Sequence, residues 1–496
     1  MQQMFGKYGL LIACMLLSLA AAHGDSVSAG PIYDIEAFGA DGDGEKLNTE
    51  AIQKAIDQCA EQGGGIVRVS AGVFRTGTIR LRSHVTLHLM PGAVLLGSED
   101  RSDYRRDMIH IDGASHVGIT GSGVIDASGP AFWEKRHDRA HQDSPESWRY
   151  VATWDYAHAE RPGHAIRFLN SEHIRIRDVT IRNSPSWTLS FNNCRDVLVD
   201  GITIRNPLHG PNTDGIDIMS SENVRIVNCD IRTGDDAIVL KNDPRHEFPT
   251  RNVTVANCVL SSVCNGFKLG TESRWGFENI TFSNSIIYSD DDMPPPFRVI
   301  SGVAIETVDG GILRNVTVSN IVMKNVRAPF FIRLGNRGRD QEEPVPGSLR
   351  GVLISNVIAT GAVIPSSITG QPGYPVEEVT LRDIHIETTG GGTDRMANRR
   401  TPMRPADYPE AFMFGSLPAY GLYCRYIRNL RLENVHIVAD APDARPVLVA
   451  KHGAGLRING FSTELPDGGE RIRLYEMEGV TIPPDGISEH ITVVQK

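Results

Sequence analysis

The segment Ile174-Arg175-Ile176-Arg177-Asp178-Val179 alternates apolar and polar side chains, as a half-buried strand does. Similar segments follow along the chain and begin at Val197, Val224, Val253, Ile280, Val316, Val352, Val379 and Leu430. The first five starts are 23, 27, 29 and 27 residues apart. Self-similarity with a period in this range is typical of solenoids, which stack one supersecondary unit on the next.

A second regularity lies four residues after each start, where the residue is always Asn, Asp or Gly. These positions are Asp178, Gly201, Asn228, Asn257, Asn284, Asn320, Asn356, Asp383 and Asn434. All three residue types tolerate a left-handed backbone bend. The next position is small or apolar, as an interior stack requires: Val179, Ile202, Cys229, Cys258, Ser285, Ile321, Val357, Ile384 and Val435. One bend therefore recurs at one place in every unit.

Units of about 25 residues with short strands and a shared bend stack as coils of a parallel β-helix. Each strand then pairs with its counterpart about 4.8 Å away in the next coil. A leucine-rich repeat is the rival solenoid, but its leucine framework and helical segments are absent. We expect an all-β chain folded as a single-stranded parallel β-helix over residues 30–496.

The open ends of a solenoid must be covered. Asn48-Thr49 predicts an N-capped amphipathic helix, because apolar residues follow at helical spacing: Ile52, Ala55, Ile56 and Cys59. This helix precedes the first strands, so residues 30–100 are expected to hold the N-terminal cap and first coils. Beyond about residue 455 the pattern fades into a polar tail, and we expect residues 455–496 to form the C-terminal cap.

Residues 1–22 have the features of a secretory signal peptide: Lys7, an apolar run over 10–19 and small residues at 20–22. A lipoprotein-like box ends at Cys14, but the apolar run continues past it. No later stretch is long enough to span a membrane. We therefore expect a secreted or periplasmic, soluble, monomeric protein with no membrane partner after signal cleavage. The net charge of −10 argues against a nucleic-acid partner, which would need a basic face.

The cysteines do not form a recognisable framework. Seven in 496 residues are too few for a disulfide scaffold, and none has zinc-site spacing. We therefore expect no metal and no cofactor. Cys229 and Cys258 fall in the interior column of neighbouring units, where we expect reduced, stacked thiols; a disulfide between them is the alternative.

The coil period brings three acids together. The first segment is Asn212-Thr213-Asp214-Gly215-Ile216-Asp217-Ile218, and the second is Gly234-Asp235-Asp236-Ala237-Ile238-Val239-Leu240. Pairing the inward residues Ile216 and Ile238 gives a shift of 22 residues. The same shift places Asp214 over Asp236, with Asp235 pointing differently.

The next coil extends this arrangement. The segment Cys264-Asn265-Gly266-Phe267-Lys268-Leu269 superposes with a shift of 29 residues. Asn265 then continues the row of Asp214 and Asp236, and Lys268 lies beside the outward row of Asp217 and Val239.

Stacked carboxylates repel one another, so one of them should have a raised pKa. Such clusters are retained mainly where protons must move. The alternative is a purely structural role, in which the acids simply belong to Asx-rich bends. Acids with that role would be scattered along the solenoid. Paired acids in an exported protein indicate hydrolysis of a glycosidic bond, in which one acid protonates the leaving oxygen and the others activate water.

At these residues the chain resembles the polygalacturonase family of glycoside hydrolases, whose members cut pectin with a right-handed parallel β-helix. The matching segments are Phe38-Gly39-Ala40, Gly42-Asp43-Gly44, Ser184-Pro185-Ser186-Trp187, His209-Gly210-Pro211-Asn212-Thr213-Asp214-Gly215 and Gly234-Asp235-Asp236. Gly270-Thr271-Glu272-Ser273 and Leu417-Pro418-Ala419-Tyr420-Gly421 resemble bacterial branches. The similarity covers nearly the whole mature chain.

The resemblance implies roles for the three acids. Asp235 would be the general acid, while Asp214 and Asp236 would hold and deprotonate the attacking water. Family members invert the anomeric centre, although closely spaced acids ordinarily indicate retention. The implied partner is a pectic polysaccharide or oligogalacturonide. Candidate substrate-binding residues are Asn212, Asn265, Asp217, Lys268, Lys241, His209 and Arg333.

Two departures from the family pattern concern the substrate. Asn265 replaces the histidine of Gly-His-Gly, and Ala304-Ile305-Glu306 replaces the Arg-Ile-Lys that grips a galacturonate carboxylate. Endo-cleavage of homogalacturonan is therefore in doubt, and side-chain-bearing or rhamnogalacturonan-type substrates come into consideration. Some other cation must meet a uronate, and the candidates are Lys241, Lys268, Arg274 and Arg333, of which Lys268 has the best expected position.

Aromatic residues give weaker signals. Trp187 and Tyr420 either line a groove or pack in the core, and His209 either touches sugar hydroxyls or packs its turn. Residues 129–163 break the period and form either a self-packed loop or the wall of a sugar-binding groove. Their aromatic and imidazole side chains are Trp133, His137, His141, Trp148 and Trp154.

Two rival functions stay open on the same scaffold. A polysaccharide lyase would need bound calcium and an Arg or Lys base, and would release products with a new double bond. A catalytically silent carbohydrate-binding or adhesion β-helix would have no use for the three converging acids. Endo or exo action depends on whether 129–163 and loops near 286–300 and 390–410 close the groove.

Overall fold

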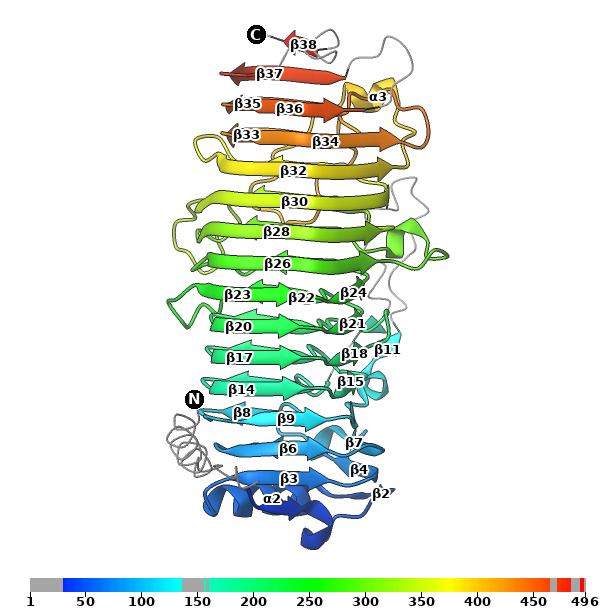
Figure 1. Cartoon of the computed structure of the whole chain (residues 1–496), viewed down its shortest axis with the longest axis vertical. Coiled ribbons are helices and arrows are strands. Elements are labelled where there is room, and N and C mark those ends of the chain that lie inside the picture. The colour runs from blue at the N-terminus through cyan, green and yellow to red at the C-terminus, as the bar shows by residue number, and fades with distance from the viewer. Residues whose placement is uncertain (1–29, 136–155, 158–159, 464–470, 483–490, 495–496) are drawn as a thin grey trace, which may run out of the picture.

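The computed structural model describes residues 30–135, 156–157, 160–463, 471–482 and 491–494. The chain is a right-handed parallel β-helix (Figure 1), in which 36 strands of the described residues join in one continuous hydrogen-bonded sheet. The expected signal peptide, 1–22, lies outside the described residues. No helix within them is long and apolar enough to cross a membrane.

The strands stack in three rows along the solenoid. Row A comprises β1 (Ile32–Asp34), β3 (Gly65–Val69), β6 (Val85–Leu89), β9 (Gly118–Gly121), β14 (Glu172–Arg177), β17 (Arg195–Asp200), β20 (Glu222–Val227) and β23 (Thr250–Ala256). Row B comprises β2 (Asp43–Leu47), β4 (Gly72–Thr76), β7 (Ala93–Gly97), β10 (Val124–Asp126), β15 (Thr180–Arg182), β18 (Thr203–Arg205), β21 (Asp230–Thr233) and β24 (Val259–Ser262).

In later coils rows A and B merge into strands that run through the bend. These are β26 (Phe277–Tyr288), β28 (Ile312–Lys324), β30 (Ser348–Ala362), β32 (Val376–Thr388), β34 (Arg431–Ala439) and β36 (Arg457–Ser462). Row C comprises β5 (Ile79–Arg80), β8 (Ile109–Asp112), β13 (Ile166–Leu169), β16 (Leu189–Asn192), β19 (Ile216–Met219), β22 (Ile238–Lys241), β25 (Asn265–Leu269), β27 (Ser301–Thr307), β29 (Ala328–Leu334), β31 (Ser366–Thr369), β33 (Leu422–Arg428), β35 (Leu448–Ala454), β37 (Ile472–Glu478) and β38 (Ile491–Val494).

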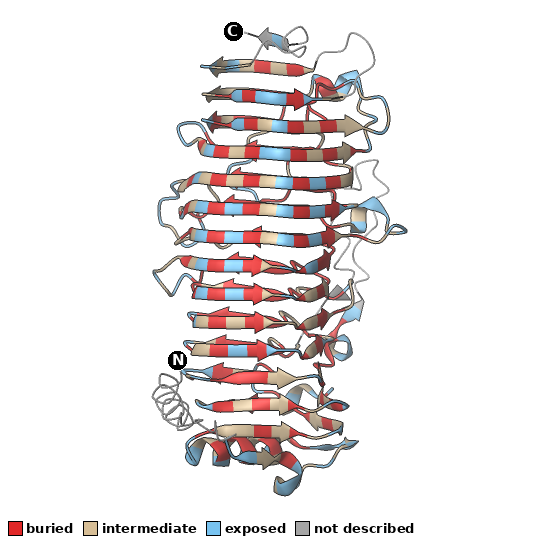
Figure 2. Cartoon of the chain, viewed as in Figure 1, coloured by how far each residue is buried: buried red, intermediate tan, exposed pale blue. Residues whose placement is uncertain are grey.

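The starts of the repeated segments found in the sequence pair with one another across neighbouring strands. Ile174 pairs with Val197, Val197 with Val224, and the series continues through Val253, Ile280, Val316, Val352 and Val379. Figure 2 shows buried residues alternating with more exposed ones along strands such as β26 and β28. The buried positions form one hydrophobic column inside the coils.

The recurring bend is left-handed, as the Asn, Asp and Gly column predicts. All nine positions have φ between 51° and 68°. Several side chains also bond between coils: the Asn257 amide donates to Asn228 Oδ1 at 3.3 Å, and Asn356 donates to Asn320 at 3.0 Å. A second left-handed column that we did not predict precedes each start, at Asn223, Asn252, Asn279 and Asn315 among others.

Replacing Asn257 by alanine should lower the free energy of unfolding by about 1–3 kcal/mol, because alanine is strained at φ 57° and loses the amide bond to Asn228. Asn257→Gly also loses that bond but removes the strain, so its loss should be smaller. Thermal or urea unfolding of both variants measures the difference. Equal losses would show that backbone strain does not contribute.

The N-terminal end is covered by helix α2 (Thr49–Glu61), which buries Ile52, Ala55, Ile56 and Cys59 as expected. Asn48 occupies the N-cap position, but the prediction that it caps the helix was wrong. Its side chain makes no capping hydrogen bond. Instead it bonds the backbone of Asp41 and Lys46 and so braces the preceding turn.

The parallel pairing continues past residue 455, where we expected the cap to begin. β36 pairs with β34, β37 with β35, and β38 with β37. The polar composition of this region hid the strand alternation. All six cysteines of the described residues are free and buried, so no disulfide joins Cys229 to Cys258.

Candidate active site

The expected register of the acidic segments is confirmed. Ile216 pairs with Ile238 across β19 and β22, and Ile238 pairs with Phe267 across β22 and β25. Just before these strands, Gly215 N donates to Asp236 O at 2.9 Å and Ala237 N donates to Asn265 O at 2.9 Å. The backbones that carry Asp214, Asp236 and Asn265 therefore lie on consecutive coils at one edge of row C.

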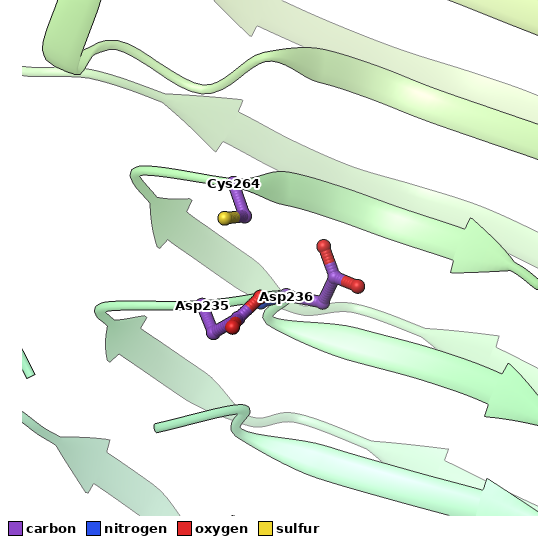
Figure 3. Close-up of side chains that lie close together, drawn as sticks. All are labelled: Asp235, Asp236 and Cys264. Atoms are coloured by element: carbon purple, nitrogen blue, oxygen red, sulfur yellow. The ribbon is translucent and has the colours of Figure 1, made fainter. Parts of the chain in front are cut away.

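The three acids differ in exposure and in partners. Asp235 is 8% exposed, against 2% for Asp214 and 4% for Asp236. Figure 3 shows Asp235 and Asp236 on one turn, with Cys264 on the neighbouring coil. Asp235 accepts hydrogen bonds from Asp236 N at 2.8 Å and from Asn212 Nδ2 at 3.4 Å. It forms no ion pair with any described residue.

The pKa of Asp235 is raised well above the ordinary value of 3.8. Burial is the largest cause, and the charges of Asp214 and Asp236 raise this pKa further. A carboxyl in such surroundings retains its proton at pH values where an ordinary carboxylate is ionised. Asp235 is therefore a candidate proton donor.

Asp236 lies in a different environment. Its Oδ1 accepts from Asn265 N at 3.1 Å and from Asn265 Nδ2 at 2.8 Å, and its Oδ2 lies 3.3 Å from Lys268 Nζ. These donors and the ammonium all stabilise the negatively charged form of a carboxylate. Asn265 thus stands where the resemblance expects a histidine, and it orients an acid.

Asp214 shares a lysine with Asp217. Lys241 Nζ lies 2.9 Å from Asp214 Oδ2 and 2.7 Å from Asp217 Oδ1. Burial lowers the pKa of Lys241, but the charges of Asp214 and Asp217 outweigh it and raise that pKa well above its usual value. Burial raises the pKa values of both acids. The Oδ1 of Asp214 is buried and has no hydrogen-bond partner among the described residues.

The cations predicted from the sequence to bind a uronate differ in their distance from the acids. Lys241 and Lys268 lie at the acids, but each already contacts two carboxylates. Lys241 contacts Asp214 and Asp217. Lys268 contacts Asp236 and, at 3.5 Å, Glu410. Arg333 is two coils further along row C, 1% exposed, and donates to the carbonyls of Met403 and Arg404. The structure therefore does not bring Arg333 to the acids.

The aromatic candidates separate in the same way. Trp187 is half-buried at the acids, with Lys241 Nζ 3.8 Å from its ring centroid. His209 is exposed, and its ring centroid lies 6.0 Å from that of Trp133. Tyr420 is 1% exposed and belongs to the interior column, so it does not line the site. His137, His141, Trp148 and Trp154 lie outside the described residues.

Three charged residues at the site were not predicted from the sequence. Glu410 comes from the non-repeating segment 389–421, and Asn265 Nδ2 lies 3.5 Å from its Oε2. Arg161 donates to Asn212 Oδ1 at 3.2 Å. Glu306 is fully buried, and both of its oxygens are without a partner among the described residues; burial raises its pKa well above the ordinary value. Only Glu306 could be found from the sequence, as the residue in place of a family lysine.

Asp235, Asp236 and Cys264 are the described residues whose potential ligand atoms lie close enough for a metal, all within 4.8 Å of one another. A metal needs the thiolate form of cysteine. Burial and the nearby acids raise the pKa of the Cys264 thiol well above its usual value, so a metal would have to displace its proton in order to bind. The cluster is better suited to holding protons than to holding a cation.

Comparison with known proteins agrees with this geometry. The family model described as "Glycosyl hydrolases family 28" matches residues 59–404. A probable polygalacturonase of Vitis vinifera is 28% identical over 70% of this chain and 73% of its own length. An exo-poly-alpha-D-galacturonosidase of Dickeya chrysanthemi is 27% identical over 68% of this chain and 64% of its own.

A solved structure supports the fold. The hyperthermoactive exopolygalacturonase of Thermotoga maritima superposes with a TM-score of 0.65 at 24% identity, over 82% of this chain and 91% of that one. Because the family model covers more than half of the sequence, the chain belongs to glycosyl hydrolases family 28 and is a glycoside hydrolase.

Proposed function

We propose that this enzyme hydrolyses galacturonosyl linkages of pectic polysaccharide or its oligosaccharides with inversion at the anomeric carbon. Asp235 protonates the departing glycosidic oxygen. Asp214 and Asp236 hold a water molecule and take its proton as its oxygen attacks the anomeric carbon, while the C–O bond to the leaving sugar breaks. Relatives named probable polygalacturonase and exo-poly-alpha-D-galacturonosidase support the substrate class.

One observation supports this division of labour above all others. Asp214 and Asp236 each contact a lysine ammonium, at 2.9 and 3.3 Å, whereas Asp235 contacts no cation among the described residues. An adjacent cation favours the charged, basic form of a carboxyl, and burial without one favours the protonated form. We therefore assign the proton of the attacking water to the two acids that lie beside lysines, and the proton of the leaving oxygen to Asp235.

The remaining features of the proposal concern location and assembly. The pattern of residues 1–22 supports export to the periplasm or the medium, where pectic polymers are met. We propose that the exported enzyme acts as a monomer without a metal or cofactor, since the three acids supply both proton transfers.

Product analysis tests the proposed function. The enzyme is incubated with homogalacturonan, rhamnogalacturonan and short oligogalacturonides, and products are identified by mass and by the anomer first formed, using NMR. Saturated galacturonosyl products of inverted configuration are expected. Retained configuration would contradict the roles of the acids. Ultraviolet-absorbing unsaturated products abolished by a chelator would indicate a lyase instead.

The raised pKa of Asp235 predicts the pH dependence of the reaction. Because Asp235 acts in its protonated form, kcat/KM should fall as pH rises through its pKa, which lies well above 3.8. The alkaline limb of the pH profile therefore reports this carboxyl. Relieving part of the repulsion by Asp214→Asn should move that limb to lower pH in the residual activity. An unmoved limb would assign it to another group.

A further inference from the structure

We propose that this enzyme attacks its polysaccharide only near a chain end, because a segment of its own chain seals row C on one side of the catalytic acids. The segment is 389–421, which connects β32 to β33 and contains helix α3 (Asp394–Ala397). This inference rests on the proposed function and adds the mode of attack to it.

The outward side chains of row C beyond the acids are covered. Ala304, Phe331, Tyr423 and Val449 follow Lys268 along this row, and none exposes any measurable surface. They form a second hydrophobic cluster with Ala411, Phe414, Leu417 and Ala419 of the segment. A face that would be open in a bare β-helix is therefore part of a core.

Buried arginines fix the segment to the coils. Arg333 donates to Met403 O at 3.1 Å and to Arg404 O at 2.9 Å. Arg425 donates to Thr401 O at 3.0 Å and to Pro402 O at 2.9 Å. Buried charged donors that satisfy backbone carbonyls are costly to separate from them. The seal is thus a permanent part of the fold.

The edge of the seal reaches the reacting groups. Glu410 of the segment lies 3.5 Å from Lys268, which itself lies 3.3 Å from Asp236. A sugar chain that runs along the coils therefore meets a wall about one coil beyond Asp236.

The opposite direction along row C differs. From Asp217 the outward row runs back through Ser190, Arg167 and His110 to Arg80. Arg167 is buried, His110 is half-buried and Arg80 is exposed, so cover decreases away from the acids among the described residues. Ser190 and Arg167 are buried as well, so the row opens only from His110 onwards. Among the described residues this is the side on which a polymer can extend, and the cleaved bond then lies a fixed number of sugars from its end.

Oligogalacturonides with a fluorophore on the reducing end test the mode of attack. We expect one product size to be released from the first turnovers, and the viscosity of homogalacturonan to fall slowly relative to new reducing ends. Labelled fragments of several lengths appearing together, with rapid loss of viscosity, would overturn the inference while leaving the proposed function intact. Absence of new reducing ends from every pectic substrate would overturn both.

An independent observation concerns Arg161, a cation near Asp214 and Asp235 that forms no direct ion pair with a carboxylate among the described residues. Its Nη1 donates to Pro185 O at 2.8 Å and to Pro211 O at 2.5 Å, and its Nη2 donates to Asn212 Oδ1 at 3.2 Å. Burial lowers its pKa to about 10, so the guanidinium is still charged at neutral pH. The charges of Asp214 and Asp235 lie near enough to raise the pKa of Arg161 in part, but its hydrogen bonds all go to neutral oxygens. A partly buried guanidinium with no directly paired carboxylate favours an anionic ligand.

The geometry points to Arg161 as the group that binds the carboxylate of a galacturonosyl residue beside the cleaved bond. Asn212, which contacts Arg161, also contacts the general acid Asp235 at 3.4 Å. The other two cations at the acids, Lys241 and Lys268, are each shared between two carboxylates. A guanidinium suits this task, because its fork can bind a carboxylate with two parallel hydrogen bonds.

Substrates that differ only in methyl esterification test this assignment. Arg161→Gln should raise KM for the free-acid oligogalacturonide about 10-fold or more, with a much smaller change for the methyl ester, whose carboxyl is uncharged. Arg161→Lys should recover part of the difference, and Arg177→Gln, at a distant exposed ion pair, controls for net charge. Equal losses on both substrates would reduce Arg161 to a structural role and overturn the assignment.

Discussion

Replacing Asp235 by asparagine should lower kcat by about 10²–10⁴-fold, the contribution expected of a general acid. Asparagine has nearly the same shape, and its oxygen can still accept from Asp236 N. What it cannot do is donate a proton to the departing glycosidic oxygen. The measurement is release of reducing ends from the substrate that the wild-type enzyme cleaves fastest. Comparable release by the variant would reject Asp235 as the acid.

Stability serves as the internal control for this variant. A carboxyl with a raised pKa in the folded state contributes its full stability at low pH and loses it as pH rises through that pKa. Asp235→Asn should therefore be at least as stable as the wild type, and the difference should grow with rising pH. Asp383→Asn is a matched control, because it changes an acid to the residue found at the same bend in other coils; its activity should equal that of the wild type.

Replacing Lys241 by methionine should lower the free energy of unfolding by about 3–5 kcal/mol, because it leaves buried carboxylates without their cation. Lys241 lies 2.9 Å from Asp214 and 2.7 Å from Asp217, and all three side chains are nearly inaccessible. Methionine retains most of the side-chain volume, so packing loss contributes little. The pKa of Asp214 should rise further, which removes a base and lowers kcat.

Urea and thermal unfolding measure this loss. Lys324→Met is the control, since Lys324 pairs with Asp291 at the surface at 2.8 Å and such pairs contribute about 0–1 kcal/mol. The triple variant Lys241→Met with Asp214→Asn and Asp217→Asn should recover part of the stability but not the activity. Similar losses for the Lys241 and Lys324 variants would contradict the assignment of a buried cation.

The solenoid was predictable because its constraint acts locally and repeats. A left-handed bend restricts residue type, so Asn228 and Asn257 report it in the sequence without reference to any distant contact. The stacking of Asp214 and Asp236 followed from the same period. Lys268 was placed correctly beside Asp217 and Val239, because the register of a parallel coil is set by inward apolar residues.

The walls of the site were not predictable in this way. Glu410 and Arg161 come from connections between strands, where no period relates sequence position to place in space. Arg333 is of the residue type expected to bind an anionic ligand, yet its guanidinium holds the segment 389–421 against the coils. Asn48 is of a residue type that often caps helices, but its side-chain amide is hydrogen-bonded to the backbone of Asp41 instead. In each case a distant partner decides the role.

The segment between β32 and β33 interrupts the coils for 33 residues, yet Val376 of β32 still aligns with Ile427 of β33 and Thr380 with Arg431 of β34. Catalytic alignment and substrate access are thus encoded in separate parts of the gene. Insertions at such connections can remodel which polymers reach the acids without shifting the acids themselves. Evolution can therefore diversify substrate range on this scaffold while the proton-transfer machinery is inherited unchanged.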